Sequence, residues 1–438
     1  MLEKLNQLEN SISQTTKNSE TIFNQLGNNI TQISKDSEIH SQKIKRIRET
    51  IRDHEEHVDK QKRINNNLDI KLEEIENKIE ELKLTDRKVE SLIENHLYRN
   101  EIICKYEIND IENYILLFNF EDKWFNSREE IEQNIELYIN ETKLKSNKFF
   151  EAKKPGIYTI KIKFNKPMNT IRKLFYQCEN LKYVDLTNLD SNNLTDISYL
   201  FSKCKNLKEI KGLDKLNTKN INRMEDLFSY CEELEVIYGL DNFNTSNVRH
   251  MASMFKNCKN LKYLDLTNFD TSNVRIFTSM FANCYTLKEI KGIDNFNTSN
   301  ALDLNGMFGG CSNLTYLDLS NFDTRKVEGM LSMFDGCINL EKIKGLSNFN
   351  TDNVKYMSHM FDGCEKLKKL DLSGFNRTNV ESFYAMFMNC INLETLNLKN
   401  FKIPNSTTDE DLVFQNINPS KCELITDDEN VKKLFYKL

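Results

Sequence analysis

Cysteine is the residue type in this sequence that could carry the most chemistry. The chain of 438 residues holds eleven cysteines, enough for disulfides, a metal site or a reactive thiol. Nine of them stand in Phe-x-x-Cys at spacings of 26 or 27 residues, and the sequence has no Cys-x-x-Cys. Neighbouring repeats could bring two cysteines to disulfide distance, but nine in one row cannot all pair. We therefore interpret them as reduced thiols that pack as small apolar side chains.

Other residue patterns that could support catalysis or metal binding are incomplete. The stretch Asp53-His54-Glu55-Glu56-His57 is similar to a zinc-binding helix, but its histidines are three apart instead of the four that one helix face requires. Gly306–Gly310 is rich in glycine yet lacks the Lys-Ser/Thr of a phosphate-binding loop. No local Ser/His/Asp arrangement supports nucleophilic catalysis. We expect a protein that is not an enzyme and that uses no metal and no cofactor.

The cysteines belong to a repeat that fills the second half of the chain. Leu or Met precedes each phenylalanine of Phe-x-x-Cys, and Leu follows each cysteine three residues later. The repeats contain the pairs Phe175/Cys178, Phe201/Cys204, Phe228/Cys231, Phe255/Cys258, Phe281/Cys284, Phe308/Cys311, Phe334/Cys337, Phe361/Cys364 and Phe387/Cys390. Nine such units at one period indicate a stacked repeat protein.

Each repeat predicts one short strand and one or two helical turns. Leu-x-x-Leu-x-Leu alternates as a strand does, and Val-x-x-Met-x-x-Met-Phe-x-x-Cys has the apolar spacing of a helix. Thr271-Ser272-Asn273 before Val274 is typical of a helix N-cap. Stacked units of this kind predict an α/β repeat solenoid, leucine-rich-repeat-like, with a parallel sheet on one face of a right-handed coil.

The outward position at the end of each strand forms a ladder of alternating charge. In a parallel sheet these residues are direct neighbours, and opposite charges between neighbours favour the register. The charged members are Asp185, Lys211, Asp265, Lys291, Asp318, Lys344 and Asp371. We interpret this ladder as a device for register and solubility.

Aromatic side chains interrupt the ladder and suggest a partner-binding surface. Tyr238 takes the place of a charged residue, and Val236 and Tyr263 adjoin it on the same face. Tyr183 and Tyr316 lie in the same column as Tyr263. Exposed aromatics that cluster on one face are typical of interface hot spots. The alternative is that loops or neighbouring lysine stems cover them.

The repeat resembles the BspA-like leucine-rich-repeat family. The signature is complete in Leu264–Val274 (Leu-Asp-Leu-Thr-Asn-Phe-Asp-Thr-Ser-Asn-Val) and continues to Cys284. The resemblance covers residues 171–401 and implies a leucine-rich-repeat fold used for protein binding, with bacterial members that are often adhesins. It brings no catalytic residues.

The first part of the chain has the pattern of a coiled coil. A heptad frame runs from Leu2 to His96, with mainly apolar residues at its a and d positions. Asn65 falls at an a position, where a buried Asn pairs best with another Asn in register. Residues 1–97 therefore predict a parallel homodimer; an antiparallel arrangement or a different partner chain is the alternative.

Two further segments flank the repeats. Residues 99–170 contain short alternating apolar stretches, such as Ile157–Phe164, and predict a small β-rich N-terminal cap. Residues 402–438 predict a C-terminal cap with one last strand near Leu424 and a short helix over Glu429–Leu438. A solenoid exposes its end layers unless such caps cover them.

Charge and hydropathy exclude several functions. A net charge of −6 and a pI near 5.8 argue against a nucleic-acid partner, and no apolar run is long enough for a membrane span. The polar start of the chain is unlike a secretory signal, which favours a cytoplasmic location. We expect a scaffold that is dimeric through its coiled coil and binds an unidentified protein partner. The alternative is a surface adhesin, exported by an unconventional route, that binds host protein or carbohydrate.

Overall fold

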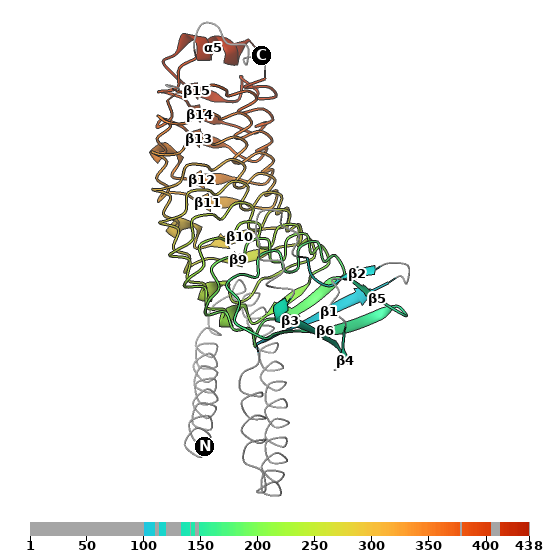
Figure 1. Cartoon of the computed structure of the whole chain (residues 1–438). Coiled ribbons are helices and arrows are strands. Elements are labelled where there is room, and N and C mark those ends of the chain that lie inside the picture. The colour runs from blue at the N-terminus through green and yellow to red at the C-terminus, as the bar shows by residue number, and fades with distance from the viewer. Residues whose placement is uncertain are drawn as a thin grey trace, which may run out of the picture. The chain divides into compact units, whose positions relative to one another are not determined.

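The structure is a computed structural model of the whole chain. It describes residues 100–109, 114–119, 133–140, 142–144, 149–376, 379–403 and 412–437. Residues 98–438 form one compact unit, a solenoid of stacked coils with a β-rich lobe at its N-terminal end (Figure 1). The predicted coiled coil over residues 1–97 and its register residue Asn65 lie outside the described residues.

The N-terminal lobe is a set of antiparallel strands that joins the first coil directly. Its strands are β1 (Glu101–Ile108), β2 (Tyr114–Leu116), β3 (Ile135–Ile139), β4 (Thr142–Lys143), β5 (Phe149–Glu151) and β6 (Gly156–Phe164). The main sheet has the order β4-β3-β6-β1-β7-β8, in which β7 and β8 belong to the solenoid. Strand β1 pairs antiparallel with β7, so it covers the backbone edge that the first coil would otherwise expose.

Successive coils pair their strands in parallel, as the sequence predicts. The coil strands are β7 (Leu181–Asp185), β8 (Glu209–Lys211), β9 (Tyr263–Asp265), β10 (Glu289–Lys291), β11 (Tyr316–Asp318), β12 (Lys342–Lys344), β13 (Lys369–Asp371), β14 (Thr395–Asn397) and β15 (Glu423–Ile425). They form separate short ladders, β7-β8, β9-β10, β11-β12 and β13-β14-β15. The third coil contributes only an isolated bridge from Val236 to Tyr263.

An inserted glycine explains these breaks in the sheet. Four coils carry it directly after the ladder position, and each such glycine opens a 3-10 helix: η1 (Leu213–Lys215), η2 (Leu240–Asn242), η3 (Ile293–Asn295) and η4 (Leu346–Asn348). Gly292 has φ 86°, a left-handed conformation that glycine adopts without steric cost. In coils without the insertion, the next residue continues the ladder, as when Leu266 N donates to Lys291 O at 2.9 Å.

The predicted helical turns before each Phe-x-x-Cys are wrong. These segments hold a column of isolated parallel bridges, from Thr170 to Ser382, followed by turns. In every repeat, the residues two before and two after the phenylalanine have φ between 53° and 74°. Ser253, Phe255 and Asn257 consequently donate their N–H groups to the next coil, at 2.7–2.9 Å. Met and Phe spacings of three and four fit this alternating turn as well as they fit a helix, so periodicity could not separate the two.

The core is a stack of identical layers. The phenylalanine rings from Phe175 to Phe387 follow one another at centroid distances of 5.4–5.9 Å and lie nearly parallel. Beside them, all eleven cysteines are free and buried. Eight thiols, from Cys204 to Cys390, donate to the phenylalanine carbonyl of the preceding repeat at 2.9–3.2 Å. The thiols therefore serve packing and hydrogen bonding.

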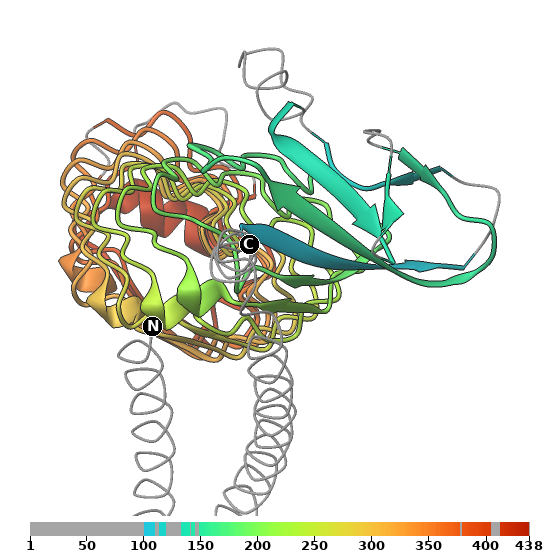
Figure 2. The same cartoon turned by 60° about the horizontal axis from the view of Figure 1, so that its bottom comes forward.

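The stack continues past the nine repeats into a partial tenth coil. Phe414 stacks on Phe387 at 5.6 Å, and β15 extends the parallel ladder of β14. Helix α5 (Glu429–Tyr436) then closes the end, with Phe435 packed edge-on against Phe414. Seen nearly along the stack, α5 lies across the far end of the coils (Figure 2). The sequence predicts a cap here but not a further coil, because the Phe-x-x-Cys spacing is lost after Cys390.

We predict that Gly292→Ala destabilises the solenoid much more than Gly363→Ala. Both glycines are left-handed, so either alanine costs about 1 kcal/mol. A Cβ at position 292 would also lie 2.5 Å from Thr267 Cα, whereas at position 363 its nearest contact is 3.5 Å. Such overpacking adds roughly 1–3 kcal/mol. Urea unfolding followed by circular dichroism measures both; equal losses would contradict the close approach.

We also predict that the thiols react slowly in the native protein. Burial raises the pKa of the Phe-x-x-Cys thiols, such as those of Cys231, Cys258 and Cys284, well above the ordinary value. Little thiolate therefore forms near neutral pH. Cys422 has the mildest shift, to about 11, and should be labelled first by a disulfide reagent. Mass spectrometry of partly labelled protein identifies the site, and fast labelling of Cys258 or Cys284 would contradict this packing.

Candidate interaction surface

The residues singled out by sequence analysis lie together on the outward side of the coil strands. Tyr183, Tyr263 and Tyr316 each stand two residues before a ladder aspartate, on β7, β9 and β11. Each tyrosine hydroxyl donates to that aspartate, at 3.2, 3.4 and 3.3 Å. The tyrosines are therefore tied to the charge ladder, a connection that the Tyr-x-Asp spacing could have revealed.

The ladder aspartates also bind a lysine from the next coil. Lys211 Nζ lies 3.3 Å from Asp185, Lys291 Nζ 2.6 Å from Asp265, and Lys344 Nζ 2.8 Å from Asp318. Each pair joins residues in direct register. A Tyr–Asp–Lys group thus recurs three times across neighbouring coils. Asp371 differs, because its neighbour is Asn397, whose amide donates to it at 2.9 Å.

These contacts shift the titration of the carboxylates and phenols. Hydrogen bonds from Lys291 and then Thr267 lower the pKa of Asp265 to about 2, and Lys344 and Ser320 lower the pKa of Asp318 in the same way. Burial, and next the Asp185 charge, raises the pKa of Tyr183 to about 12. The carboxylates are held ionised and the phenols protonated, as structural ion pairs require.

Tyr238 is the exception on this face. It occupies the ladder position of the third coil, where the neighbouring coils have Lys211 and Asp265, and it is 76% exposed. Val236 and Tyr263, which form a bridge beside it, are half-buried. Tyr316 is exposed, while Tyr183 is half-buried beneath Lys105, whose Nζ lies 4.8 Å from its ring centre. The five predicted binding residues are thus unequal, and Tyr238 is the freest.

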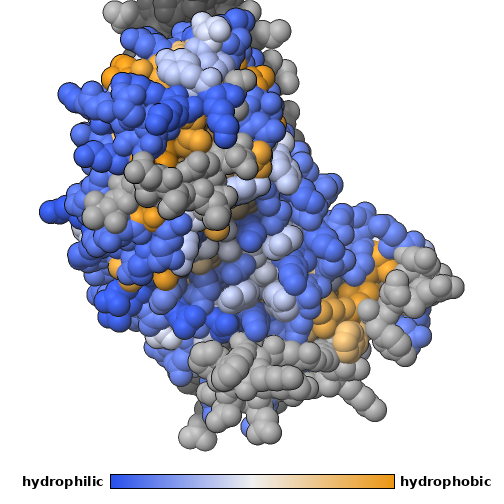
Figure 3. All heavy atoms as spheres, turned by 90° about the horizontal axis from the view of Figure 1, so that it is seen from above, coloured by the Kyte–Doolittle hydropathy of each residue, from blue (hydrophilic) through white to orange (hydrophobic). Residues whose placement is uncertain are grey.

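The hollows on the outer surface of the coils are shallow and lined mainly by polar side chains. Among the described residues, no group of three or more His, Cys, Asp or Glu side chains has a geometry that could hold a metal ion. One of these hollows is lined by lysine, asparagine, threonine and glutamate. In the part of the chain that the structure describes, the helical segments lack the length and apolar character needed to cross a bilayer. Seen from above, the coils carry mostly polar side chains, and apolar groups lie among them and on the β-rich lobe (Figure 3).

We predict that the Asp265 carboxyl stays ionised to about pH 2. A lowered pKa contributes stability above the unfolded value of ~3.9, and this contribution is lost as the pH falls towards 2. Lys291→Gln should return the midpoint towards ~3.9, because it removes the main hydrogen bond. NMR titration of 13C-labelled aspartate measures this midpoint, with Lys342→Gln as the control; an unchanged midpoint in Lys291→Gln would contradict the pairing.

Comparison with known proteins gives a family and a structural likeness. One family, described as "Mycoplasma protein of unknown function, DUF285", matches at residues 169–289, 204–317, 255–344 and 302–425. No curated protein matches the chain. The chain is similar to a crystal structure of a leucine rich cell surface protein from Faecalibacterium prausnitzii A2-165, with 14% identity and a TM-score of 0.34, over 62% of this chain and 85% of that chain.

The family matches overlap one another and together run from residue 169 to residue 425. This range begins before the first Phe-x-x-Cys unit and includes the partial tenth coil, so it spans the whole solenoid and more than half of the 438 residues. The chain therefore belongs to the family described as Mycoplasma protein of unknown function, DUF285.

Proposed function

We propose that the protein is a non-enzymatic scaffold that binds a protein partner on the strand face of its solenoid. Repeat solenoids offer long, rigid surfaces suited to this role. The observation that carries the proposal is Tyr238, a tyrosine that is 76% exposed at the one ladder position of the nine repeats without a charged or amide side chain. Tyrosine is enriched at binding hot spots because it combines a large apolar ring with a polar end.

The surroundings of Tyr238 support a specific contact. Val236 and Tyr263 provide apolar surface on one side, and Glu235 with Lys262 forms an ion pair of 2.5 Å on the same coils. An apolar centre with a charged, solvated rim is the usual anatomy of a protein interface. The ladder pairs on either side fix these coils, so the surface is formed before the partner binds.

The proposal includes a dimer through residues 1–97, with Asn65 as the register residue. The support for this part is the heptad pattern of the sequence. Two solenoids on one dimer would bind a multivalent partner with an avidity gain. Sedimentation of the full chain and of a chain lacking residues 1–97 tests it, and equal association of the two would contradict a coiled-coil dimer.

We predict that Tyr238→Ser abolishes capture of at least one partner while the fold is kept. The tagged full chain is used as bait in extract of its own source cells, followed by quantitative mass spectrometry. Tyr436→Ser is the matched control, because Tyr436 is also well exposed, at 61%, but lies on α5. We expect a loss of ten-fold or more with Tyr238→Ser alone. Retention of every partner would contradict the proposal.

A separate experiment distinguishes the two cellular locations considered from the sequence. Protease treatment of intact cells degrades the solenoid if the protein is displayed at the surface and leaves it intact if the protein is cytoplasmic. A surface location would direct the search for partners to extracellular proteins or glycans, and a cytoplasmic one to proteins of the same cell.

A further inference from the structure

Several charged side chains of the solenoid pair with an opposite charge on the next coil. On the strand face, Asp265 pairs with Lys291 and Asp318 with Lys344. Other columns contain pairs of the same kind: Glu179 with Lys205 at 2.7 Å, and Glu232 with Lys259 at 2.8 Å. One such pair, Glu328 with Lys355 at 2.7 Å, lies on the opposite side of the coils. Neighbouring coils are only ~4.8 Å apart, so like charges in one column would repel.

One side of the coils also brings like charges together. We call it the turn face, and it consists of the nine-residue segments around each core phenylalanine: 169–177, 195–203, 222–230, 249–257, 275–283, 302–310, 328–336, 355–363 and 381–389. On it, Arg249 and Arg275 are neighbours, since Arg275 N donates to Arg249 O at 3.0 Å. Asp335 and Asp362 are also neighbours, through Gly336 N and Asp362 O.

Several of these charges form no ion pair within the chain. Among the described residues, these are Arg249, Lys256, Arg275, Asp303 and Asp335. Lys256 interacts electrostatically with Asp226 without forming an ion pair. Burial, and next the charge of Asp362, raises the pKa of Asp335, whereas the nearby His359 lowers it. A counter-charge from outside the chain would add to these contacts.

The two kinds of charge are segregated along the turn face. The first five segments contain seven basic and three acidic residues, and Asp196, Glu225 and Asp226 are the acidic three. Two of these already contact arginine, Asp196 through Arg172 and Glu225 through Arg172 and Arg223. The last four segments contain five acidic residues and one basic residue, Lys355. The turn face is therefore positive in one half and negative in the other.

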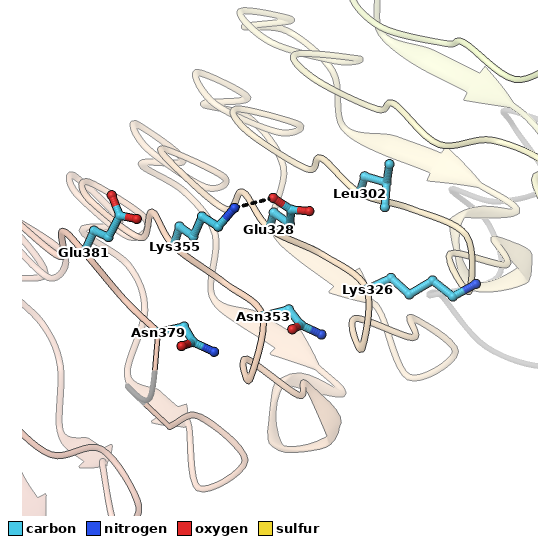
Figure 4. A pocket seen from close by; sticks show the side chains of 7 residues that line it. All are labelled: Leu302, Lys326, Glu328, Asn353, Lys355, Asn379 and Glu381. Carbon is cyan, nitrogen blue, oxygen red and sulfur yellow. Dashed lines mark hydrogen bonds and ion pairs between the residues drawn. The ribbon is translucent and has the colours of Figure 1, made fainter.

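Apolar side chains accompany the acidic half. Leu302, Leu331, Tyr356 and Tyr384 are all exposed there. Figure 4 shows Glu328, Lys355 and Glu381 in a row on successive coils, with Leu302 on the coil before them. Exposed apolar residues inside a ring of charge are typical of a protein-binding surface.

We propose that the turn face binds the turn face of a second copy of this chain, with the two solenoids antiparallel. A face that is positive in one half and negative in the other is complementary to itself when one copy is turned end for end. A two-fold axis of this kind gives an isologous interface, the commonest type in homo-oligomers. Charge complementarity of this kind steers association and suppresses wrong partners.

The columns of the turn face fix the register of this contact. With the axis between segments 275–283 and 302–310, each side chain faces the same column of the other copy. Lys256 then faces Asp335, Arg249 faces Glu328, and Arg275 lies at Leu302 and Asp303. The proposal is independent of residues 1–97 and of the strand face around Tyr238, so each can fail without the others.

Charge exchange on the full chain tests the register. Lys256→Glu and Asp335→Lys should each weaken salt-sensitive self-association by about ten-fold or more in sedimentation at low salt. The double variant should restore it to within about three-fold, because the exchanged charges meet again across the axis. Lys342→Glu on the strand face is the matched control and should change nothing. Failure of the double variant to recover, with all variants folded, would overturn the proposal.

Zero-length cross-linking locates the contact directly. A carbodiimide is added to a mixture of unlabelled and 15N-labelled full chain. Within one chain, Lys256 and Asp335 are three coils apart, ~14 Å along the stack, which such a link cannot span. A linked peptide of mixed label joining Lys256 to Asp335, reduced at high salt, supports the proposal. Cross-links between copies that occur only elsewhere would overturn it, including links confined to residues 1–97 or to a parallel register.

Discussion

Hydrogen bonding from each coil to the next is the constraint on which the rest of the structure depends. The buried hydroxyl of Thr271 both donates to Asn297 O, at 3.1 Å, and accepts from Asn297 N, at 2.8 Å. Thr298, Thr324 and Thr351 repeat this double contact with the following coil. A buried hydroxyl without partners is costly, so each coil has one register only. Register, in turn, converts the repeat into fixed columns of surface side chains.

The sequence predicted the parts of the fold that depend on spacing alone. Lys291 and Asp265 were expected to be neighbours because a strand repeated every 26 or 27 residues brings equal positions together, and they lie 2.6 Å apart. The turn before Phe255 was wrong because Met251, Met254 and Phe255 satisfy a helix and an alternating left-handed turn equally. The spacing of apolar residues does not reveal a left-handed backbone conformation. Here Ser253 and Asn257 adopt that conformation, so no glycine marks it in the sequence.

In the candidate site, too, the spacing of the repeats predicted some features and not others. Its residues could be placed on one face from the repeat, but their exposure could not. Tyr183 carries the same Tyr-x-Asp pattern as Tyr316, yet it is half-buried because β1 adds a strand beside β7. That contact joins residues distant in the chain, and a repeat pattern contains no information about it. The same holds for the coil of Phe414, which is recognised by the stacking of Phe414 on Phe387 and by the parallel pairing of β15 with β14.

The two faces of the solenoid share one core, and the repeats differ from one another mainly at their outward positions. Each coil has a strand side and a turn side, and the core between them is filled by Leu, Phe, Met and Cys side chains with little variation. Variation is therefore concentrated in the outward columns, where it does not disturb the stack. Several columns use this freedom to pair opposite charges between neighbouring coils, which lowers repulsion within the chain. Tyr238 on the strand side and the segregated charges on the turn side depart from this pattern. At each of these two places, the surface leaves side chains available for contacts with another molecule.

A pair of solenoids joined by their turn faces would leave both strand faces uncovered, since these lie on a different side of each coil. Such a pair would present two copies of the Tyr238 surface in opposite directions. A partner with repeated binding segments could then engage both surfaces, and the second contact would benefit from the effective concentration set by the first. Weak individual sites on a shallow, polar surface would suffice for stable binding, which agrees with a face that offers one free aromatic residue instead of a deep pocket.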